Sequence, residues 1–301
     1  MLPGPGVCLD GSPGAYYLRP PLVPVPNPTE TFVVYHEGGG WCASDANCYD
    51  RAQGDLGSSK GYPDLAPNTL PNTVGYEGAS LFASRYFASA TIAYAKYCDG
   101  GSWAGFNSTP TFFNNTRIHY MGRPLLDALF ADLLANRGLA SASAVLYSGC
   151  SAGGLTAYMH LDYLRSVLPP STRLLGLADA MFALHVPAYP GPGHETYLEG
   201  MMEHCFFAMN ASASVNQACL AHYGAQGNEC FYGGQVACVC ASKAPFLRPT
   251  AHARAESPAF ACARRAAPPI SPSPTPSYAA ARPPHPLPLC AGPLWRRRYW
   301  W

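Results

Sequence analysis

Short apolar runs that end in turn residues recur along the first two thirds of the chain. Residues 31–36 are apolar and rich in β-branched and aromatic side chains, and three glycines, Gly38–Gly40, follow almost at once. A continuous apolar run of this length that meets glycines predicts a buried strand entering a sharp loop. By the same pattern we expect further strands at residues 86–94, 144–147 and 174–178.

Two segments between these strands have the spacing of helices. Apolar residues recur with a helical period from Arg123 to Asn136, where Pro124 suits the first turn and Gly138 suits the stop. Residues 155–168 predict a second helix, which a pair of prolines ends. Strands that alternate with helices at these intervals predict an α/β fold, with a mostly parallel sheet covered by helices on both faces.

The character of the sequence changes from about Gly233 onward. Residues 263–294 are so rich in proline that helices and central strands are disfavoured there. This tail is either a disordered Pro-rich linker or ligand segment, or the product of a shifted frame or retained intron, which we favour. We therefore predict an incomplete α/β domain over residues 1–232 and a disordered Pro/Ala-rich tail over residues 233–301.

Charge and cysteine content narrow the class of protein. The 301 residues include 19 Lys and Arg against 18 Asp and Glu, so no overall field attracts nucleic acid or an anionic membrane. No apolar run reaches the length of a membrane span. The 12 cysteines are spread along the chain as in disulfide-bonded proteins. Cys238-x-Cys240 has no second pair at zinc spacing, so we expect no metal and no cofactor.

The cysteines also indicate where the protein resides. Together with Asn-x-Ser/Thr sequences at Asn107, Asn114 and Asn210, they favour a secreted glycoprotein, which we expect to be a monomer. The chain starts at Met1 without a basic segment and an apolar core of the signal-peptide kind. We therefore expect that the natural start lies upstream.

The most informative stretch is Gly149-Cys150-Ser151-Ala152-Gly153, which satisfies G-x-S-x-G between a predicted strand and a predicted helix. On such a strained turn the Ser151 hydroxyl is raised toward a substrate as a nucleophile, and the glycines let strand and helix pass closely. The N–H of Ala152, at the helix N-terminus, can then hydrogen-bond an oxyanion. Cys150 is the rival nucleophile, but its position directs it away from the site, buried or in a disulfide.

The glycines after the first strand predict a partner for this turn. Esterases of the α/β-hydrolase class place a second oxyanion donor on a Gly-rich loop upstream of the serine. Gly39 and Gly40 are the expected donors, because consecutive glycines bring N–H groups close to a ligand without obstruction. A Gly triplet alone is more often a flexible turn, so the prediction depends on the pairing with Ser151.

Several motifs together resemble the pectin acetylesterase family, which also includes the Notum carboxylesterases of animals. They are Cys8-Leu-Asp-Gly-Ser12, His36-Glu-Gly-Gly-Gly-Trp-Cys42, Tyr97-Cys-Asp-Gly100 and Ser148-Gly-Cys-Ser-Ala-Gly-Gly154, in the form of the plant branch. The resemblance covers about three quarters of the chain, residues 7–231. It implies a secreted α/β-hydrolase-like fold, a Ser-Asp-His triad, an oxyanion hole that matches Gly39, Gly40 and Ala152, and no metal. It also makes a disulfide between Cys42 and Cys48 an expectation.

The sequence departs from the family downstream of Cys230-Phe231-Tyr232, where the triad Asp and His are expected. No aspartate follows Asp179, and His252 and His285 lie in Ala/Pro-rich sequence that matches no family motif. Asp179 itself follows the next strand, but its segment in the family belongs to the sheet. Three further histidines, His185, His194 and His204, are more typical of surface or core positions than of a base.

Three hypotheses follow from this partial match. The first is a serine carboxylesterase that removes O-acetyl groups from pectin-like cell-wall polysaccharide through an acyl-enzyme on Ser151. The second is a catalytically inactive carbohydrate- or lipid-binding protein with the same fold. The third is a truncated gene model that does not fold stably. Nucleotide and zinc-hydrolase motifs are absent from the sequence.

Overall fold

The computed structural model describes residues 1–2, 4–64, 87–185, 197–233 and 235. In chain order the strands are β1 (Tyr16–Arg19), β2 (Thr31–His36), β3 (Thr91–Ala95), β4 (Thr111–Phe113), β5 (Thr116–Ile118), β6 (Ala144–Cys150) and β7 (Arg173–Asp179). The α-helices are α1 (Asp45–Arg51), α4 (Gly122–Asn136), α5 (Ala152–Val167), α6 (Tyr197–Glu203) and α7 (Gln217–Tyr223). Short 3₁₀ helices η2 (Leu139–Ser141) and η4 (Gly224–Phe231) and a π-helical turn η3 (His204–Ala208) complete them.

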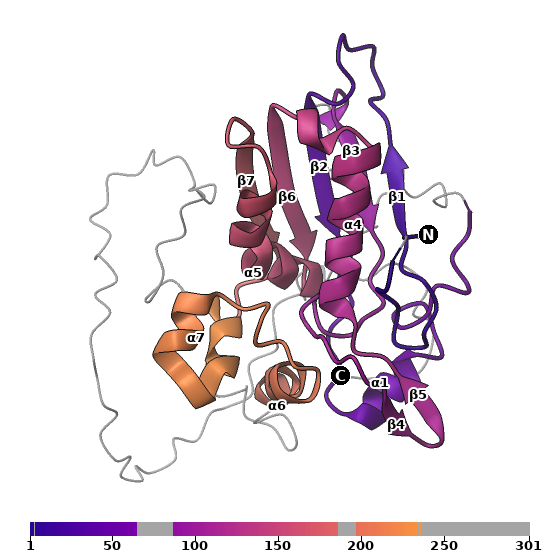
Figure 1. The fold of residues 1–301 in the computed structure, drawn as a ribbon, viewed down its shortest axis with the longest axis vertical. Helices are drawn as coiled ribbons and strands as arrows, with labels where there is room; N and C mark the ends of the chain where they lie inside the picture. Colours follow the sequence, from indigo (N-terminus) through magenta and orange to yellow (C-terminus); the bar gives the residue numbers. More distant parts are fainter. Residues whose placement is uncertain (3, 65–86, 186–196, 234, 236–301) are drawn as a thin grey trace, which may run out of the picture.

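The main sheet has the strand order β1-β3-β2-β6-β7 (Figure 1). The pairs β3–β2, β2–β6 and β6–β7 are parallel, whereas β1 lies at the edge of the sheet and pairs antiparallel with β3. The pairing places His36, the last residue of β2, opposite Gly149 of β6. The register therefore brings the Gly-rich loop after β2 and the turn after β6 to the same end of the sheet.

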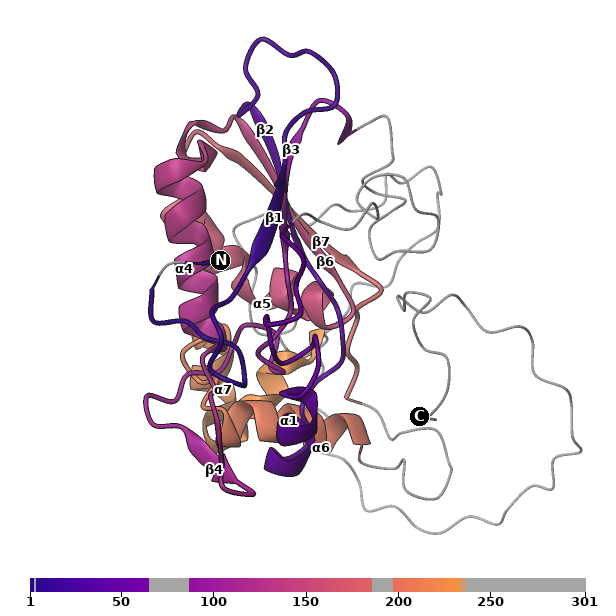
Figure 2. The ribbon, with the colours of Figure 1, turned by 90° about the vertical axis from the view of Figure 1, so that its right-hand side faces the viewer.

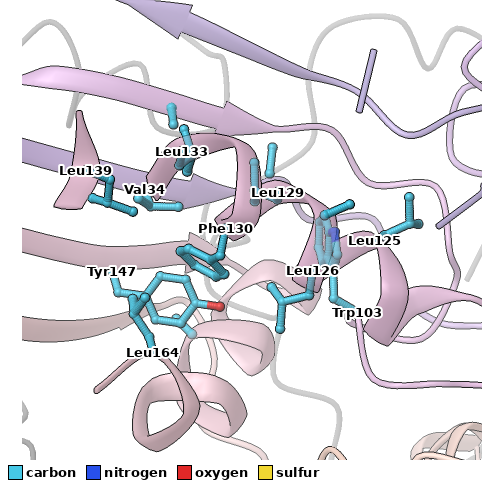
Figure 3. Close-up of a cluster of buried hydrophobic side chains, with 14 of the residues drawn as sticks. Val34, Trp103, Leu125, Leu126, Leu129, Phe130, Leu133, Leu139, Tyr147 and Leu164 are labelled. Atoms are coloured by element: carbon cyan, nitrogen blue, oxygen red, sulfur yellow. The ribbon is translucent and has the colours of Figure 1, made fainter. Parts of the chain in front are cut away.

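Helices α4 and α5 cover one face of this sheet (Figure 2). Figure 3 shows the contact, in which apolar side chains of α4 meet Val34 of β2 and Tyr147 of β6. Leu126, Leu129 and Leu133 are fully buried, as the helical spacing in the sequence requires. On the other face Val33, Tyr35, Ile92 and Tyr94 are buried as well, which fits strands that are apolar on both sides.

A second cluster of apolar side chains lies beyond the ends of β2 and β6. Figure 1 shows α1, α6, α7 and the β4–β5 hairpin there, at the end toward which these strands point. Disulfides Cys42–Cys48 and Cys219–Cys230 belong to this region, and Cys8–Cys98 ties the N-terminal segment to the chain after β3. The expected Cys42–Cys48 disulfide is therefore confirmed.

The sequence-based elements agree with the structure except at their ends. The strand expected at residues 86–94 begins only at Thr91, because the Ala90 N–H turns back to the carbonyl of Phe87. The strand expected at 144–147 continues to Cys150, and α5 begins at Ala152 instead of Leu155. The turn between them is thus reduced to Ser151. Among the described residues, no helix is long and apolar enough to cross a membrane.

Candidate active site

Ser151 stands alone between the last residue of β6 and the first residue of α5. Its backbone has φ 54° and ψ −119°, a region that residues with a side chain seldom occupy. Two hydrogen bonds hold it there: the Ser151 N–H donates to the carbonyl of Asp179, and the Ser151 carbonyl accepts from Leu155, both at 3.0 Å. The conformation is the sharp strand-to-helix turn that G-x-S-x-G predicts.

The glycines of the motif are required by close backbone contacts. A Cβ on Gly149 would lie 2.3 Å from the carbonyl oxygen of Gly153, and a Cβ on Gly153 would lie 2.0 Å from that of His36. A Cβ on Gly154 would lie 2.8 Å from the carbonyl oxygen of Asp179. Because real Cβ atoms do not approach backbone this closely, strand, turn and helix can pack together only with glycine at all three positions.

The loop after β2 runs past this turn with its glycines in conformations that other residues avoid. Gly39 has φ 152° and Gly40 has φ 68°. Before them, the buried Glu37 pairs with Lys96 and accepts a 2.9 Å hydrogen bond from the N–H of Tyr97. The carbonyl groups of Gly39 and Gly40 accept hydrogen bonds from Arg51 and Tyr97, respectively. Within the described part of the chain, the N–H groups of these two glycines carry no hydrogen bond and remain available to a ligand.

Ser102 joins this loop to the nucleophile turn. Its hydroxyl accepts a 2.7 Å hydrogen bond from the indole of Trp41, next to Gly40, and donates one of 2.7 Å to the carbonyl of Ala152. Ser102 is fully buried with φ 55°. The buried Asp99 holds this segment by accepting hydrogen bonds from the N–H groups of Gly101 and Trp103, at 3.2 and 2.9 Å. Burial raises the pKa of Asp99 to about 7.

Two buried histidines lie near the turn, and among the described residues neither imidazole hydrogen-bonds to a carboxylate. His36 ends β2, and neither of its ring nitrogens has a hydrogen-bond partner among the described residues. Burial, and then the neighbouring His160 of α5, hold the pKa of His36 well below its usual range. Burial also lowers the pKa of His160 to about 3. Both imidazoles are therefore neutral at neutral pH and act as core side chains.

The structure places the serine, alanine and glycines considered from the sequence at one end of the sheet. Ser151, Ala152 and the Gly39–Gly40 loop meet at one end of adjacent strands, and Ala152 opens α5, where a first-turn N–H has no acceptor within the helix. Cys150 is fully buried among side chains of the opposite face and is disulfide-bonded, so it is not exposed to a substrate. The arrangement can present a serine hydroxyl together with oxyanion donors.

The histidines and the acid considered from the sequence do not complete a triad in the described structure. The Ser151 hydroxyl has no hydrogen bond to an imidazole or carboxylate among the described residues. His185 stacks on Tyr232 and lies 2.9 Å from the carboxylate of Glu229, and His204 contacts Cys48. Asp179 contacts Ser151 through its backbone carbonyl, which accepts the hydrogen bond from the Ser151 N–H. His194, His252 and His285 lie outside the described residues.

Sequence reasoning missed Ser102, Trp41 as its partner, and the pair His36 and His160. Ser102 follows Gly100-Gly101, and a glycine pair marks a tight turn without showing which hydroxyl it buries. His36 and His160 are far apart in the chain and meet only through the packing of α5 against β2. A buried polar residue inside an apolar strand was the available signal for His36.

Comparison with known proteins identifies the family of the chain. Residues 4–246 match the family described as Pectinacetylesterase. Pectin acetylesterase 5 of Arabidopsis thaliana is 29% identical over 218 residues, which cover 71% of this chain and 47% of the relative. Pectin acetylesterase 11 of the same plant is 32% identical, over 60% of this chain and 43% of the relative. The human palmitoleoyl-protein carboxylesterase Notum is 28% identical, over 60% of this chain and 35% of the relative.

The fold is also found in a solved structure. The Wnt deacylase Notum from Drosophila superposes with a TM-score of 0.65 at 22% identity, over 80% of this chain and 66% of that one. The likeness confirms the α/β-hydrolase-like fold. This chain spans less than half the length of the curated relatives named above. With a family match that extends over most of its residues, the chain belongs to the pectinacetylesterase family.

Proposed function

We propose that this chain is a serine carboxylesterase that removes O-acetyl groups from a pectin-like cell-wall polysaccharide. The observation that carries the proposal is the backbone of Ser151, whose φ of 54° places a serine on a strained turn beside the Gly39–Gly40 loop. Strain of this kind is retained where it serves a function. The named relatives include pectin acetylesterases, and they supply the substrate class.

In the proposed reaction the Ser151 oxygen attacks the acetyl carbonyl carbon while a base accepts the hydroxyl proton. The N–H groups of Gly39, Gly40 and Ala152 hold the negative oxygen of the tetrahedral intermediate. The sugar hydroxyl leaves with a proton, and water then releases acetate from Ser151. Gly39 and Gly40 lie in the loop that follows β2 and Ala152 begins α5, so the proposed donors come from two separate segments of the chain.

We also propose that the protein is secreted. The described disulfides Cys8–Cys98, Cys42–Cys48 and Cys219–Cys230 are bonds that persist in oxidising compartments. The division of the chain into an esterase part, residues 1–232, and a Pro/Ala-rich tail remains a prediction. A monomeric state and glycosylation are part of the same prediction.

The test measures the nucleophilic reactivity of Ser151 directly, because no aspartate follows Asp179 and the downstream histidines match no family motif. The full chain is treated with a fluorophosphonate, which modifies activated serines, and the modified peptide is identified by mass spectrometry. Acetate release from acetylated pectin is measured in parallel. We expect modification at Ser151 and loss of both signals in Ser151→Ala.

The outcome separates the two functional hypotheses. A folded chain that is not modified at Ser151 and releases no acetate would support a catalytically inactive carbohydrate- or lipid-binding protein. Acetate release that persists in Ser151→Ala would contradict the assignment of the nucleophile. Hydrolysis of a small acetyl ester is measured as well. If the chain hydrolyses this ester but releases no acetate from pectin, the esterase activity is present and only the polysaccharide substrate is wrong.

A further inference from the structure

Three Asn-x-Ser/Thr sequences lie within the described residues, beginning at Asn107, Asn114 and Asn210. Each is an acceptor sequence for an N-linked glycan in a chain that enters the secretory pathway. The three asparagine side chains have different surroundings in the folded chain. The inference below concerns which one carries a glycan, and it rests on the proposed secretion.

The side chains of Asn107 and Asn210 tie two loops together. Asn107 Nδ2 donates a 2.7 Å hydrogen bond to the carbonyl of Ala208, and Asn210 Nδ2 donates one of 3.0 Å to the carbonyl of Phe106. The Phe106 N–H adds a bond of 2.8 Å to the carbonyl of Met209. Each amide nitrogen thus faces the opposing backbone at close range. A sugar would replace one of the two hydrogens on either nitrogen and would crowd this junction, although Asn107 is only half-buried and Asn210 is exposed.

Asn114 lies instead at the tip of the β4–β5 hairpin. Phe113 pairs with Thr116, so the loop consists of Asn114 and Asn115 alone, with φ of 48° and 58°. Positive φ at both positions is the two-residue hairpin turn that asparagine favours. The Asn114 side chain is exposed, and its nearest hydrogen-bond partner is the Tyr49 hydroxyl at the long distance of 3.5 Å. Figures 1 and 2 show the hairpin at the periphery of the molecule.

Aromatic side chains surround this tip without being covered. Phe112 is 65% exposed and Phe113 is 37% exposed, although each belongs to a three-residue strand of a small hairpin. The Tyr49 ring lies 5.7 Å from that of Phe113, on the side of the hairpin where the Asn114 amide is found. Exposed aromatic groups of this kind pack against the apolar face of a sugar ring. A sugar attached to Asn114 would therefore meet an aromatic surface beside it.

We propose that Asn114 is the N-glycan acceptor of this chain, whereas the amides of Asn107 and Asn210 are structural and stay unmodified. The co-reactant is an oligosaccharide joined to a lipid diphosphate. The Asn114 nitrogen forms a bond to the anomeric carbon of the first sugar, and the bond from that carbon to the diphosphate oxygen breaks. The lipid diphosphate leaves with the electron pair, and the amide proton passes to a base of the transferase.

The experiment expresses the full chain behind a cleavable secretory leader in a eukaryotic host. Intact mass before and after treatment with a glycan-removing amidase gives the number of glycans, and peptide mass spectrometry gives their positions. Asn107→Gln, Asn114→Gln and Asn210→Gln are compared. Thr116→Ala destroys the acceptor sequence while keeping Asn114, and both secreted and cell-retained protein are analysed so that a folding defect does not hide the result.

We expect one glycan, lost completely in Asn114→Gln and in Thr116→Ala and retained in the other two variants. A glycan on Asn107 or Asn210 in the secreted parent chain would overturn the proposal. So would a chain whose leader is cleaved but whose Asn114 carries no sugar. The same measurement on Ser151→Ala should give the same glycan, which separates this result from the outcome of the esterase test.

Discussion

The hydroxyl of Ser102 donates a 2.7 Å hydrogen bond to the carbonyl oxygen of Ala152, the residue that follows the proposed nucleophile. Because the hydroxyl oxygen of Ser102 also accepts a hydrogen bond from the indole of Trp41, the first turn of α5 is coupled to the Gly-rich loop. One buried hydroxyl therefore connects the two elements that supply the proposed oxyanion donors. Preorganised donors of this kind contribute most when they cannot move as charge develops.

Replacing Ser102 by alanine should therefore affect reactivity as well as stability. Loss of a buried hydrogen-bond partner costs about 1–3 kcal/mol of unfolding free energy. We expect phosphonate modification of Ser151 to slow by about 10-fold or more, less than the effect of removing an oxyanion donor outright. Ser166→Ala, at an exposed site on α5, is the matched control. Equal modification rates in both variants would contradict a positioning role for Ser102.

Gly153→Ala tests the packing of the turn against β2. The added Cβ would lie 2.0 Å from the carbonyl oxygen of His36, an atom fixed within the sheet. We expect a loss of about 3 kcal/mol or more in urea unfolding, since backbone cannot move aside as a side chain can. The control is Gly200→Ala in α6, where a Cβ meets nothing within 4 Å. That variant should gain up to about 1 kcal/mol from helix propensity.

The strain at Ser151 predicts that this position is not optimised for stability. Its φ of 54° and ψ of −119° are readily adopted by glycine and disfavoured for any residue with a Cβ. We expect Ser151→Gly to be more stable than Ser151→Ala by about 1–2 kcal/mol. Urea unfolding of the two variants, monitored by circular dichroism, measures the difference. Equal midpoints would show that the turn stores no strain.

The buried histidines predict that stability falls as the pH is lowered. Burial depresses the pKa values of His36 and His160, the latter to about 3, so below pH 6.5 the unfolded chain binds protons that the folded chain does not. Each such proton contributes up to about 1.4 kcal/mol per pH unit. Asp99 opposes this trend between its ordinary range and about 7, because burial raises its pKa and the folded chain then binds the extra proton.

Burial also lowers the pKa values of His119 and His204, which act in the same direction as His36 and His160, so near pH 5 to 6 unfolding should take up protons and stability should fall as the pH is lowered. His160→Gln should reduce this slope by up to about one proton, which corresponds to about 1.4 kcal/mol per pH unit. Urea midpoints at pH 7.5, 6 and 5 measure the slope. His222→Gln, at an exposed position on α7, is the matched control. An unaltered slope in His160→Gln would show that this imidazole is not held neutral by burial.

The sequence by itself determined the fold class and the centre of the site. Apolar runs over residues 31–36 and 144–147 are local signals, and G-x-S-x-G specifies a turn whose geometry depends on residues adjacent in the chain. The strand-to-helix change at Ser151 was foreseen for this reason. The end of the β6 strand was misplaced, because Ser148 to Cys150 pair with β2 and β7, and pairing partners distant in sequence leave no local trace.

Only the tertiary structure decided how the site is supported and which surface groups are accessible. Ser102 reaches Ala152 because the segment after β3 folds beneath the turn, and His36 meets His160 because α5 packs on β2. Asn107, Asn114 and Asn210 share the Asn-x-Ser/Thr pattern, but the amides of Asn107 and Asn210 donate to backbone carbonyls whereas that of Asn114 faces only the Tyr49 hydroxyl at 3.5 Å. Contacts between residues far apart in the chain depend on packing, whereas motifs and periodicity record only what neighbouring residues favour.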